Sequence, residues 1–343
     1  MRTQGWRLGV GCASTRRAWL AGCLTVGWAF ALLMFQGCSS GGMSGSASPP
    51  KDAARRSGSP APDTTSFVPE PPGASGLSEP LALTIGVNEG YCRKTACKCV
   101  HHIAAREFEP LQQRLKDRFG IQLDLSYFPG DLFELQKRIQ TGELDGALAK
   151  PWPILKCARE AKRNYLRVAD LLNPNGNAEL RGIVLVKRDS PIHTWADLAG
   201  KRVAWGQADA YEKHHAVLAL FRRQGVDPAS LKMQELSSCM ENIGALLDDT
   251  ADVAAISDYA FDVDCLVDFA KKEDFRVLGQ TEPAIPAASL LLDMDRVAPA
   301  KASRLVHALL SLAGDPDLKD ALLGDGFVKP APWSPAELPE LAR

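Results

Sequence analysis

Beyond Pro80, the sequence alternates short apolar runs with amphipathic helical patterns. The run Leu81–Val87 predicts a strand, and Ala104–Phe119 predicts a helix with one apolar face that ends at Gly120. A second apolar run, Ile121–Tyr127, predicts the next strand. Because strands that alternate with helices are joined by helical crossovers, this order predicts an α/β fold with mostly parallel sheets.

The same alternation extends to residue 312. It predicts further helices at residues 131–141, 194–198, 211–224, 240–248 and 299–312. It predicts further strands at residues 144–148, 183–187, 202–205, 231–235, 253–256, 275–278, 283–286 and 288–293. The chain has 343 residues, which is enough for one large or two medium domains.

Charge and composition narrow the functional classes. The chain holds 40 basic and 41 acidic side chains, so no excess of one sign draws the whole protein to nucleic acid or anionic lipid. Hydrophobic residues make up 45% and charged residues 24%, which excludes collagen, a coiled coil and wholesale disorder. Since the sequence contains no P-loop and no His-Glu-x-x-His motif, we expect neither an enzyme nor a bound cofactor.

The first 37 residues have the pattern of an export signal. Several arginines and no acidic residue precede the apolar run Ala18–Phe35. Gly37 then stands directly before Cys38, an ending that resembles a bacterial lipoprotein signal in which Cys38 is lipidated and becomes the mature N-terminus. The alternative is an uncleaved anchor, because about 18 apolar residues can span a bilayer. Either interpretation places the rest of the chain outside the cytoplasm, in the periplasm or at the cell surface.

Residues 38–80 form a segment of a different composition, mostly Ser, Gly, Pro and Ala. Such a stretch has too little apolar surface to offset the entropy of ordering its backbone, so it predicts a flexible, disordered tether. A tether behind a membrane anchor lets the folded part reach a neighbour on the same surface. This arrangement favours a capture or delivery protein over a freely diffusing enzyme.

Several segments of the folded part resemble one family of binding proteins. Leu83–Val87, Phe108–Leu111 and Thr141–Ala147 look like the first lobe of the phosphate/phosphite/phosphonate-type periplasmic binding proteins. Val186–Ala204 is similar to the beginning of that family's second lobe. Its Ser-Pro pair, its short helix with Asp-Leu and its Gly-Lys-Arg-Val run follow the family's order and spacing.

The resemblance implies a type II periplasmic-binding-protein fold, in which two α/β lobes are joined by a two-crossover hinge and close over a ligand. The first lobe would comprise residues 81–182 together with 283–343, and the second lobe residues 183–282. The implied partners are a small polar ligand, such as a phosphonate or phosphate, and the permease of an ABC importer.

The resemblance also implies two aromatic ligand contacts in the first lobe. Tyr91 follows the first strand, and ligands of open α/β sheets bind beyond the carboxyl ends of strands. Trp152 follows the strand at 144–148 and stands where the family has its second cleft aromatic. The alternatives are a surface tyrosine at 91 and a tryptophan at 152 that only packs a turn.

The family's main anion site is a Ser/Thr-rich turn at a helix N-terminus, and residues 207–215 stand there in this chain. Asp209 and Glu212 predict a capping box, which would occupy the same backbone N–H groups and repel a phosphonate. We therefore expect weak phosphonate binding or a ligand that also carries a cationic group. Tyr211 and His214 are candidate ligand contacts in this turn, with an ordinary helix surface as the alternative.

Three more candidates follow strands of the second lobe. Ser237 and Ser238 precede the helix at 240–248, where a hydroxyl either donates to an oxyanion or caps the helix. Asp258 follows the strand at 253–256, where a carboxylate either accepts from an aminoalkyl group or ends the strand.

Six cysteines remain beyond Cys38, and an exported compartment permits disulfides. The first interpretation is three bridges, with the pairing open, among Cys92, Cys97, Cys99, Cys157, Cys239 and Cys265. The second is a site for zinc or copper(I), since thiolate and imidazole ligands suit these metals. Its ligands would come from Cys92, Cys97, Cys99, His101 and His102.

The leading hypothesis is a lipid-anchored solute-binding protein of an ABC importer that holds a small oxyanion between two lobes. The rival is a Cys/His metal- or redox-active binding protein on the same fold. A sensor domain that reports ligand occupancy to a membrane partner is the third hypothesis.

Overall fold

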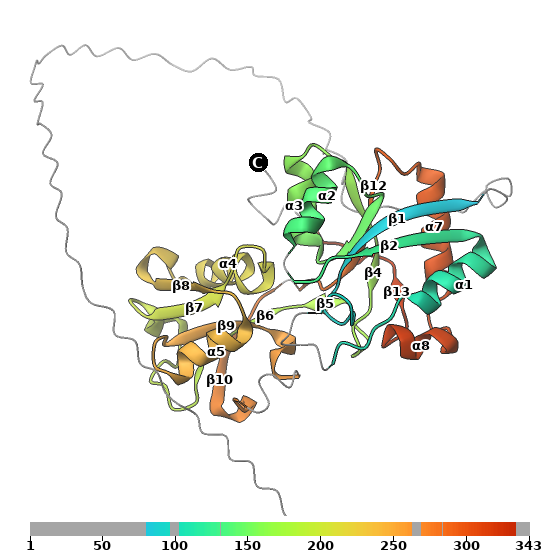
Figure 1. Ribbon diagram of the computed structural model, residues 1–343. Coiled ribbons are helices and arrows are strands. Elements are labelled where there is room, and N and C mark those ends of the chain that lie inside the picture. The colour runs from blue at the N-terminus through green and yellow to red at the C-terminus, as the bar shows by residue number, and fades with distance from the viewer. Residues whose placement is uncertain (1–79, 97–102, 131, 263–268, 283, 334–343) are drawn as a thin grey trace, which may run out of the picture. The chain divides into compact units, whose positions relative to one another are not determined.

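The computed structural model describes residues 80–333, apart from 97–102, 131, 263–268 and 283 (Figure 1). The predicted signal segment and tether, with Cys38, lie outside the described residues, and so do Cys97, Cys99, His101, His102 and Cys265. Within the part described, no helix is long and apolar enough to cross a membrane.

A six-stranded mixed sheet forms the first lobe. Its strand order is β13-β4-β12-β3-β1-β2. Strand β1 pairs in parallel with β2 and β3, whereas β12 runs antiparallel between β3 and β4. The strands are β1 (Leu81–Asn88), β2 (Ile121–Tyr127), β3 (Gly146–Ala149), β4 (Tyr165–Leu171), β12 (Ser289–Asp293) and β13 (Phe327–Val328).

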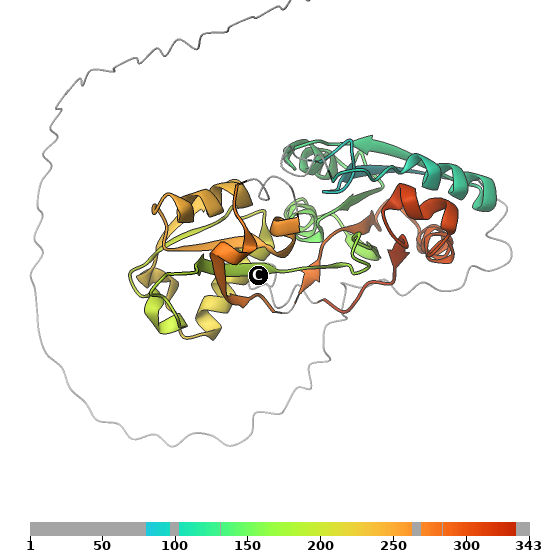
Figure 2. The same cartoon turned by 90° about the horizontal axis from the view of Figure 1, so that it is seen from below.

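Helices cover both faces of this sheet. One apolar core includes Leu115 and Leu305, and α1 (Glu109–Phe119) lies there beside α7 (Pro299–Ser311) and α8 (Pro316–Leu322), as Figure 2 shows. A second core includes Ile139 and Ile154 of the contacting helices α2 (Phe133–Thr141) and α3 (Pro151–Glu160). For α1, the apolar face that predicts the helix is the face that it buries, with Leu111 and Leu115 inside the core.

A five-stranded sheet forms the second lobe, with the order β10-β6-β9-β7-β8. Strands β9, β7 and β8 are parallel, β6 is antiparallel to β9, and the edge strand β10 is antiparallel to β6. The strands are β6 (Gly182–Lys187), β7 (Arg202–Gly206), β8 (Lys232–Leu236), β9 (Val253–Ser257) and β10 (Phe275–Gln280). The helical segments are η2 (Trp195–Leu198), η3 (Tyr211–Lys213), α4 (His215–Arg223), η4 (Pro228–Ser230), α5 (Cys239–Leu247), η5 (Asp258–Asp262) and η6 (Lys272–Asp274).

Two crossovers join the lobes, which confirms the predicted type II fold. β5 (Glu179–Leu180) and β11 (Ile285–Pro286) pair with each other as an antiparallel ribbon. Beside them, the N–H of Gly182 donates to Thr281 Oγ1 at 2.8 Å, and the N–H of Thr281 donates back to the Gly182 carbonyl at 2.8 Å. The two connections are thus hydrogen-bonded to each other as they pass between the sheets.

The predicted helix at 104–119 is wrong at its start, because the helix begins at Glu109. Before it, Arg106 forms a parallel bridge with Cys92, and its guanidinium lies buried against Glu89. Pro110 stands in the first helical turn, where its missing N–H leaves no hydrogen bond unmade. The helix therefore starts where the proline permits it.

The predicted helix at 211–224 is divided into η3 and α4. His214 lies between them with φ −125° and ψ −86°, outside the helical region. The helix α3 has no counterpart in our sequence predictions. It begins with Pro151-Trp152-Pro153, and its first turn tolerates the prolines.

Candidate ligand-binding cleft

A cavity of about 1070 Å³ is lined by residues of both lobes and of the hinge. Five strands each have a residue on its wall, at or directly after the carboxyl end of the strand. Ligands of open α/β sheets bind at this end of the strands. These residues are Asn88 for β1, Lys150 for β3, Gln207 for β7, Ser237 for β8 and Asp258 for β9. The hinge adds Glu179 and Leu180 of β5.

The structure brings together half of the residues that the sequence nominated. Tyr91, Asp209, Ser237 and Asp258 lie on the wall of this cavity. The other four nominated residues are absent from its lining and have other contacts, which the following paragraphs describe: Trp152, Tyr211, His214 and Ser238.

Trp152 packs between the lobes. Only 2% of it is exposed, and its ring centroid lies 4.9 Å from that of Tyr211 and 5.2 Å from that of His215. The same apolar cluster contains Leu180 of the hinge and Trp333 near the C-terminus. Trp152 and Tyr211 thus form an interlobe apolar contact in this structure.

His214 is held in the second lobe by packing and one short hydrogen bond. Its ring stacks on Trp205 with 4.0 Å between centroids. Its Nδ1 lies 2.7 Å from the carbonyl oxygen of Gly206, which makes Nδ1 the protonated nitrogen. The side chain is buried, and its ring faces Trp205.

Ser237 and Ser238 take part in the cap of α5. Ser238 Oγ accepts from the N–H of Glu241 at 3.1 Å, and Glu241 Oε2 accepts from the N–H and the hydroxyl of Ser237 at 2.8 and 2.7 Å. These bonds from Ser237 hold the pKa of Glu241 below its ordinary value. Ser237 nevertheless remains on the cavity wall.

The predicted capping box of Asp209 and Glu212 is wrong. Ala210 is the N-cap of η3, and no side chain makes a cap hydrogen bond there. Glu212 is 1% exposed, and its Oε1 lies 3.0 Å from Lys150 Nζ of the first lobe while it accepts from the hydroxyl of Ser257 at 2.7 Å. The carboxylate expected to repel a ligand is therefore ion-paired with a lysine across the cleft.

Both charges of this interlobe pair are stabilised. Burial acts to lower the pKa of Lys150, but the Glu212 carboxylate outweighs it and the pKa is raised. Burial acts to raise the pKa of Glu212, but Lys150 and then Lys213 hold it below its ordinary value. Sequence reasoning missed Lys150, although its place directly after β3 is the signal that could have found it.

Asp258 lies where β9 meets the hinge. Its Oδ2 accepts from the N–H of Arg181 at 3.0 Å, and its own N–H donates to the Arg181 carbonyl at 2.9 Å. Burial, with a smaller contribution from the Glu212 charge, raises the pKa of this carboxyl. The side chain thus ends the strand and faces the cavity at the same time.

Tyr91 sits beside a buried ion pair. Arg106 Nη1 lies 2.9 Å from Glu89 Oε1, and the Arg106 guanidinium lies 5.6 Å from the centre of the Tyr91 ring. Glu89 Oε1 also accepts from the N–H of Tyr91 at 3.1 Å. These contacts hold the loop after β1 in place, and Glu89 and Tyr91 both lie on the cavity wall.

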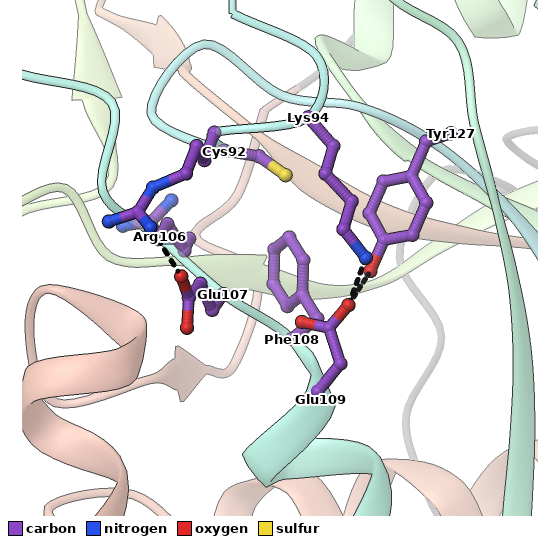
Figure 3. Close-up of a pocket in the computed structure, with 8 residues that line it drawn as sticks. Cys92, Lys94, Arg106, Glu107, Phe108, Glu109 and Tyr127 are labelled. Atoms are coloured by element: carbon purple, nitrogen blue, oxygen red, sulfur yellow. Dashed lines mark hydrogen bonds and ion pairs between the residues drawn. The ribbon is translucent and has the colours of Figure 1, made fainter. Parts of the chain in front are cut away.

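A second, smaller cavity of about 230 Å³ lies in the first lobe (Figure 3). Lys94 Nζ lies 4.3 Å from the centre of the Tyr127 ring and is paired with Glu109. Burial raises the pKa of Tyr127. Cys92 also lines this cavity, but none of the residues nominated as ligand contacts does.

The prediction of three disulfides is wrong for the cysteines that the structure describes. Cys92, Cys157 and Cys239 are free thiols. They pack in three separate apolar clusters. Burial raises the pKa of both the Cys92 and the Cys157 thiol. Among the described residues, no group of three or more His, Cys, Asp or Glu side chains could hold a metal ion.

Two lobes, a two-crossover hinge and a cavity at the strand ends define a periplasmic solute-binding protein. The chain belongs to the family described as ABC transporter, phosphonate, periplasmic substrate-binding protein, whose model matches residues 101–338. The resemblance seen in the sequence is confirmed. The family consists of extracytoplasmic binding components of transporters and is not an enzyme family. No curated protein matches the chain.

Several solved structures share the fold. XAC2383 from Xanthomonas citri, bound to ATP, is 19% identical with a TM-score of 0.55, and the match covers 76% of this chain and 94% of that one. PhnD1 from Prochlorococcus marinus, in complex with methylphosphonate, is 12% identical with a TM-score of 0.53, and the match covers 77% and 98%. The aliphatic sulphonate binding protein SsuA from Escherichia coli is 22% identical with a TM-score of 0.51, and the match covers 71% and 78%.

Proposed function

We propose that this protein is a lipid-anchored solute-binding component of an ABC importer, which captures a small oxyanion such as a phosphonate or phosphate and delivers it to the permease. The observation that carries the proposal is the cavity at the carboxyl ends of five strands, with Lys150 and Lys213 on its wall. Cys38 would hold the lipid, and residues 38–80 would act as the tether. The relatives solved with methylphosphonate or named for sulphonate support an oxyanion ligand.

The lobes would be the moving units of this binding protein. The six-stranded sheet takes its strands from residues 81–171 and 289–328, and the five-stranded sheet takes them from 182–280. This supports a first lobe of residues 81–182 and 283–343 and a second lobe of residues 183–282. Ligand binding would then be coupled to motion at the β5–β11 ribbon.

The wall of the cavity favours a ligand that carries a cationic group beside its oxyanion. Asp209 and Asp258 both line the cavity. A carboxylate on the wall attracts an ammonium and repels a second negative charge. An aminoalkylphosphonate or an aminoalkylsulfonate therefore fits better than inorganic phosphate.

A thermal-shift screen of the mature protein tests this function. The panel is phosphate, phosphite, alkyl- and aminoalkylphosphonates, the matching sulfonates and divalent metals. A ligand at a hundredfold excess over its Kd stabilises the folded state by roughly 2.7 kcal/mol. Tyr91→Ala should reduce the shift, because it removes part of the cavity wall.

The matched control is Tyr165→Ala, which removes a buried tyrosine of β4 that is not part of the cavity lining. It should lower the melting point of the free protein but keep the ligand-induced shift. If a divalent metal alone shifts the melting point and no oxyanion does, the oxyanion function is wrong and the metal-binding alternative takes its place.

A further inference from the structure

Two lysines from opposite lobes meet at one buried carboxylate. Lys150 follows β3 of the first lobe, Lys213 ends η3 of the second lobe, and both line the large cavity. Glu212 is ion-paired with Lys150 at 3.0 Å, and the positive charges of Lys150 and Lys213 both hold its pKa below the ordinary value. The two ammonium groups and the Glu212 carboxylate together carry one net positive charge, which is the charge of these three groups alone.

Lys150 is fixed but remains available to a ligand. Its Nζ lies 3.0 Å from Glu212 Oε1, and its side chain is 33% exposed. An ammonium group has three N–H donors, and Glu212 uses one of them. The Ser257 hydroxyl donates to the same carboxylate oxygen at 2.7 Å, which holds Glu212 in place.

Lys213 forms no ion pair with any described residue. Its stem packs over Gly206, where an added Cβ would lie 2.3 Å from Lys213 Cγ. Its Nζ lies 3.7 Å from Cys239 Sγ. A thiol is a weak acceptor for a buried ammonium, and the cavity that Lys213 lines is where a stronger acceptor can enter.

The other charges of the wall add no positive charge to this corner. Glu89 is paired with Arg106, and Glu179 with Arg181. Asp258 also lines this cavity, and the Glu212 charge acts on its carboxyl. Tyr259 and Cys239 are the remaining titratable neighbours of the Lys150 and Glu212 pair.

We propose that Lys150 and Lys213 bind the acid group of the ligand from the two lobes, and that Glu212 positions Lys150 and restricts the site to an acid group with a single negative charge. The inference rests on the proposed function and names the charge state of its ligand. A singly charged oxyanion matches the one free positive charge of the corner. A second negative charge on the ligand would have no ammonium left to pair with, and the Glu212 and Asp258 carboxylates would repel it.

Calorimetric titration with two matched probes tests the inference. Taurine and 2-aminoethylphosphonate carry the same ammonium arm, but the sulfonate keeps one negative charge while the phosphonate gains a second as pH rises. Below the second phosphonate ionisation, we expect comparable affinities for the two probes. Above it, we expect 2-aminoethylphosphonate to bind at least tenfold more weakly relative to taurine. The taurine titration corrects for any ionisation of the protein itself.

Three variants separate the roles. Glu212→Gln keeps the shape and the Ser257 contact but removes the negative charge, and it should improve binding of the doubly charged phosphonate about tenfold relative to taurine. Lys150→Met and Lys213→Met keep the apolar stems, and each should weaken both probes at least tenfold. Lys301→Met is the control, because Lys301 is an exposed residue of α7 outside the cavity lining, and it should change neither Kd.

The outcomes distinguish this inference from the proposed function. If the parent protein binds a probe and both lysine variants bind it equally well, the two-lysine site is wrong and the solute-binding function stands. If Glu212→Gln leaves the ratio of the two probes unchanged above the second ionisation, the charge restriction is wrong. If the parent binds no member of the oxyanion panel, both the function and the inference fail.

Discussion

At the scale of single residues, buried charge is the feature that organises the first lobe beside the cavity. Arg106 and Glu89 have side chains that are 0% and 3% exposed, and they lie 2.9 Å apart. The guanidinium also donates to the carbonyls of Leu322 and Leu172, both at 2.7 Å. One arginine thus connects the loop after β1 to two distant parts of the chain and fixes the wall that carries Tyr91.

We predict that Arg106→Met lowers the free energy of unfolding by about 3–5 kcal/mol, because it leaves the Glu89 carboxylate buried without its partner. Arg93→Met is the matched control, since the Arg93–Glu107 pair is 59% and 46% exposed and such a pair contributes about 0–1 kcal/mol. Chemical denaturation measures both. The double variant Arg106→Met with Glu89→Gln should recover part of the loss, and equal losses for the Arg93 and Arg106 variants would contradict the argument.

The residues that the sequence could nominate are those that follow strands. Tyr91, Ser237 and Asp258 were found in this way, and all three lie on the cavity wall. Lys150 obeys the same rule but was missed, because the prolines after it suggested a turn and the partner that explains it, Glu212, is 62 positions away. A pairing at that distance is set by the tertiary fold and leaves no local pattern.

At the scale of elements, most strands were predictable because their apolar runs are local, and most of their observed bounds fall within one or two residues of the predicted ones. The division of the helix at 211–224 was not predictable. It depends on two close approaches, Lys213 over Gly206 and the Glu212 backbone against Gly182. The sequence shows the two glycines, but it does not show which segments of the folded chain pack against them.

We predict that Gly182→Ala displaces η3 and weakens ligand binding. An added Cβ would lie 2.0 Å from the Glu212 carbonyl oxygen, so either the hinge crossover or η3 must move. The expected loss is about 1–3 kcal/mol of folding free energy, as for overpacked sites, together with a weaker response to ligand. Thermal melting with and without the best oxyanion of the panel measures both effects.

Gly244→Ala provides the control for that substitution. Gly244 lies within α5, and the nearest atom to an added Cβ is an ordinary contact at 3.6 Å. Alanine is favoured over glycine within a helix by roughly 0.5–1 kcal/mol. This variant should melt at the same or a higher temperature and respond normally to ligand. A loss of ligand response here, or none in Gly182→Ala, would contradict the role given to η3.

At the scale of the whole molecule, one apolar cluster touches both lobes and the hinge. Trp152 of α3, Tyr211 of η3 and Leu180 of β5 belong to it, together with Trp333. Arg167 lies 5.5 Å from the centre of the Trp333 ring, so the chain near its C-terminus packs against β4 as well. The contact between the lobes therefore combines an apolar cluster with the Lys150–Glu212 ion pair.

In the proposed function, Cys38 holds the folded part at a membrane. We predict that the mature protein begins at an acylated Cys38 and that Cys38→Ser leaves an unprocessed precursor without lipid mass. One acyl chain anchors a protein only weakly and several hold it stably, so the parent should sediment with membranes. Intact mass measurement of the membrane fraction checks the cleavage and the acyl chains together. A mature form that begins at another residue and carries no acyl group would contradict the lipid anchor but would leave the binding cavity, which is built entirely within residues 88–323, unaffected.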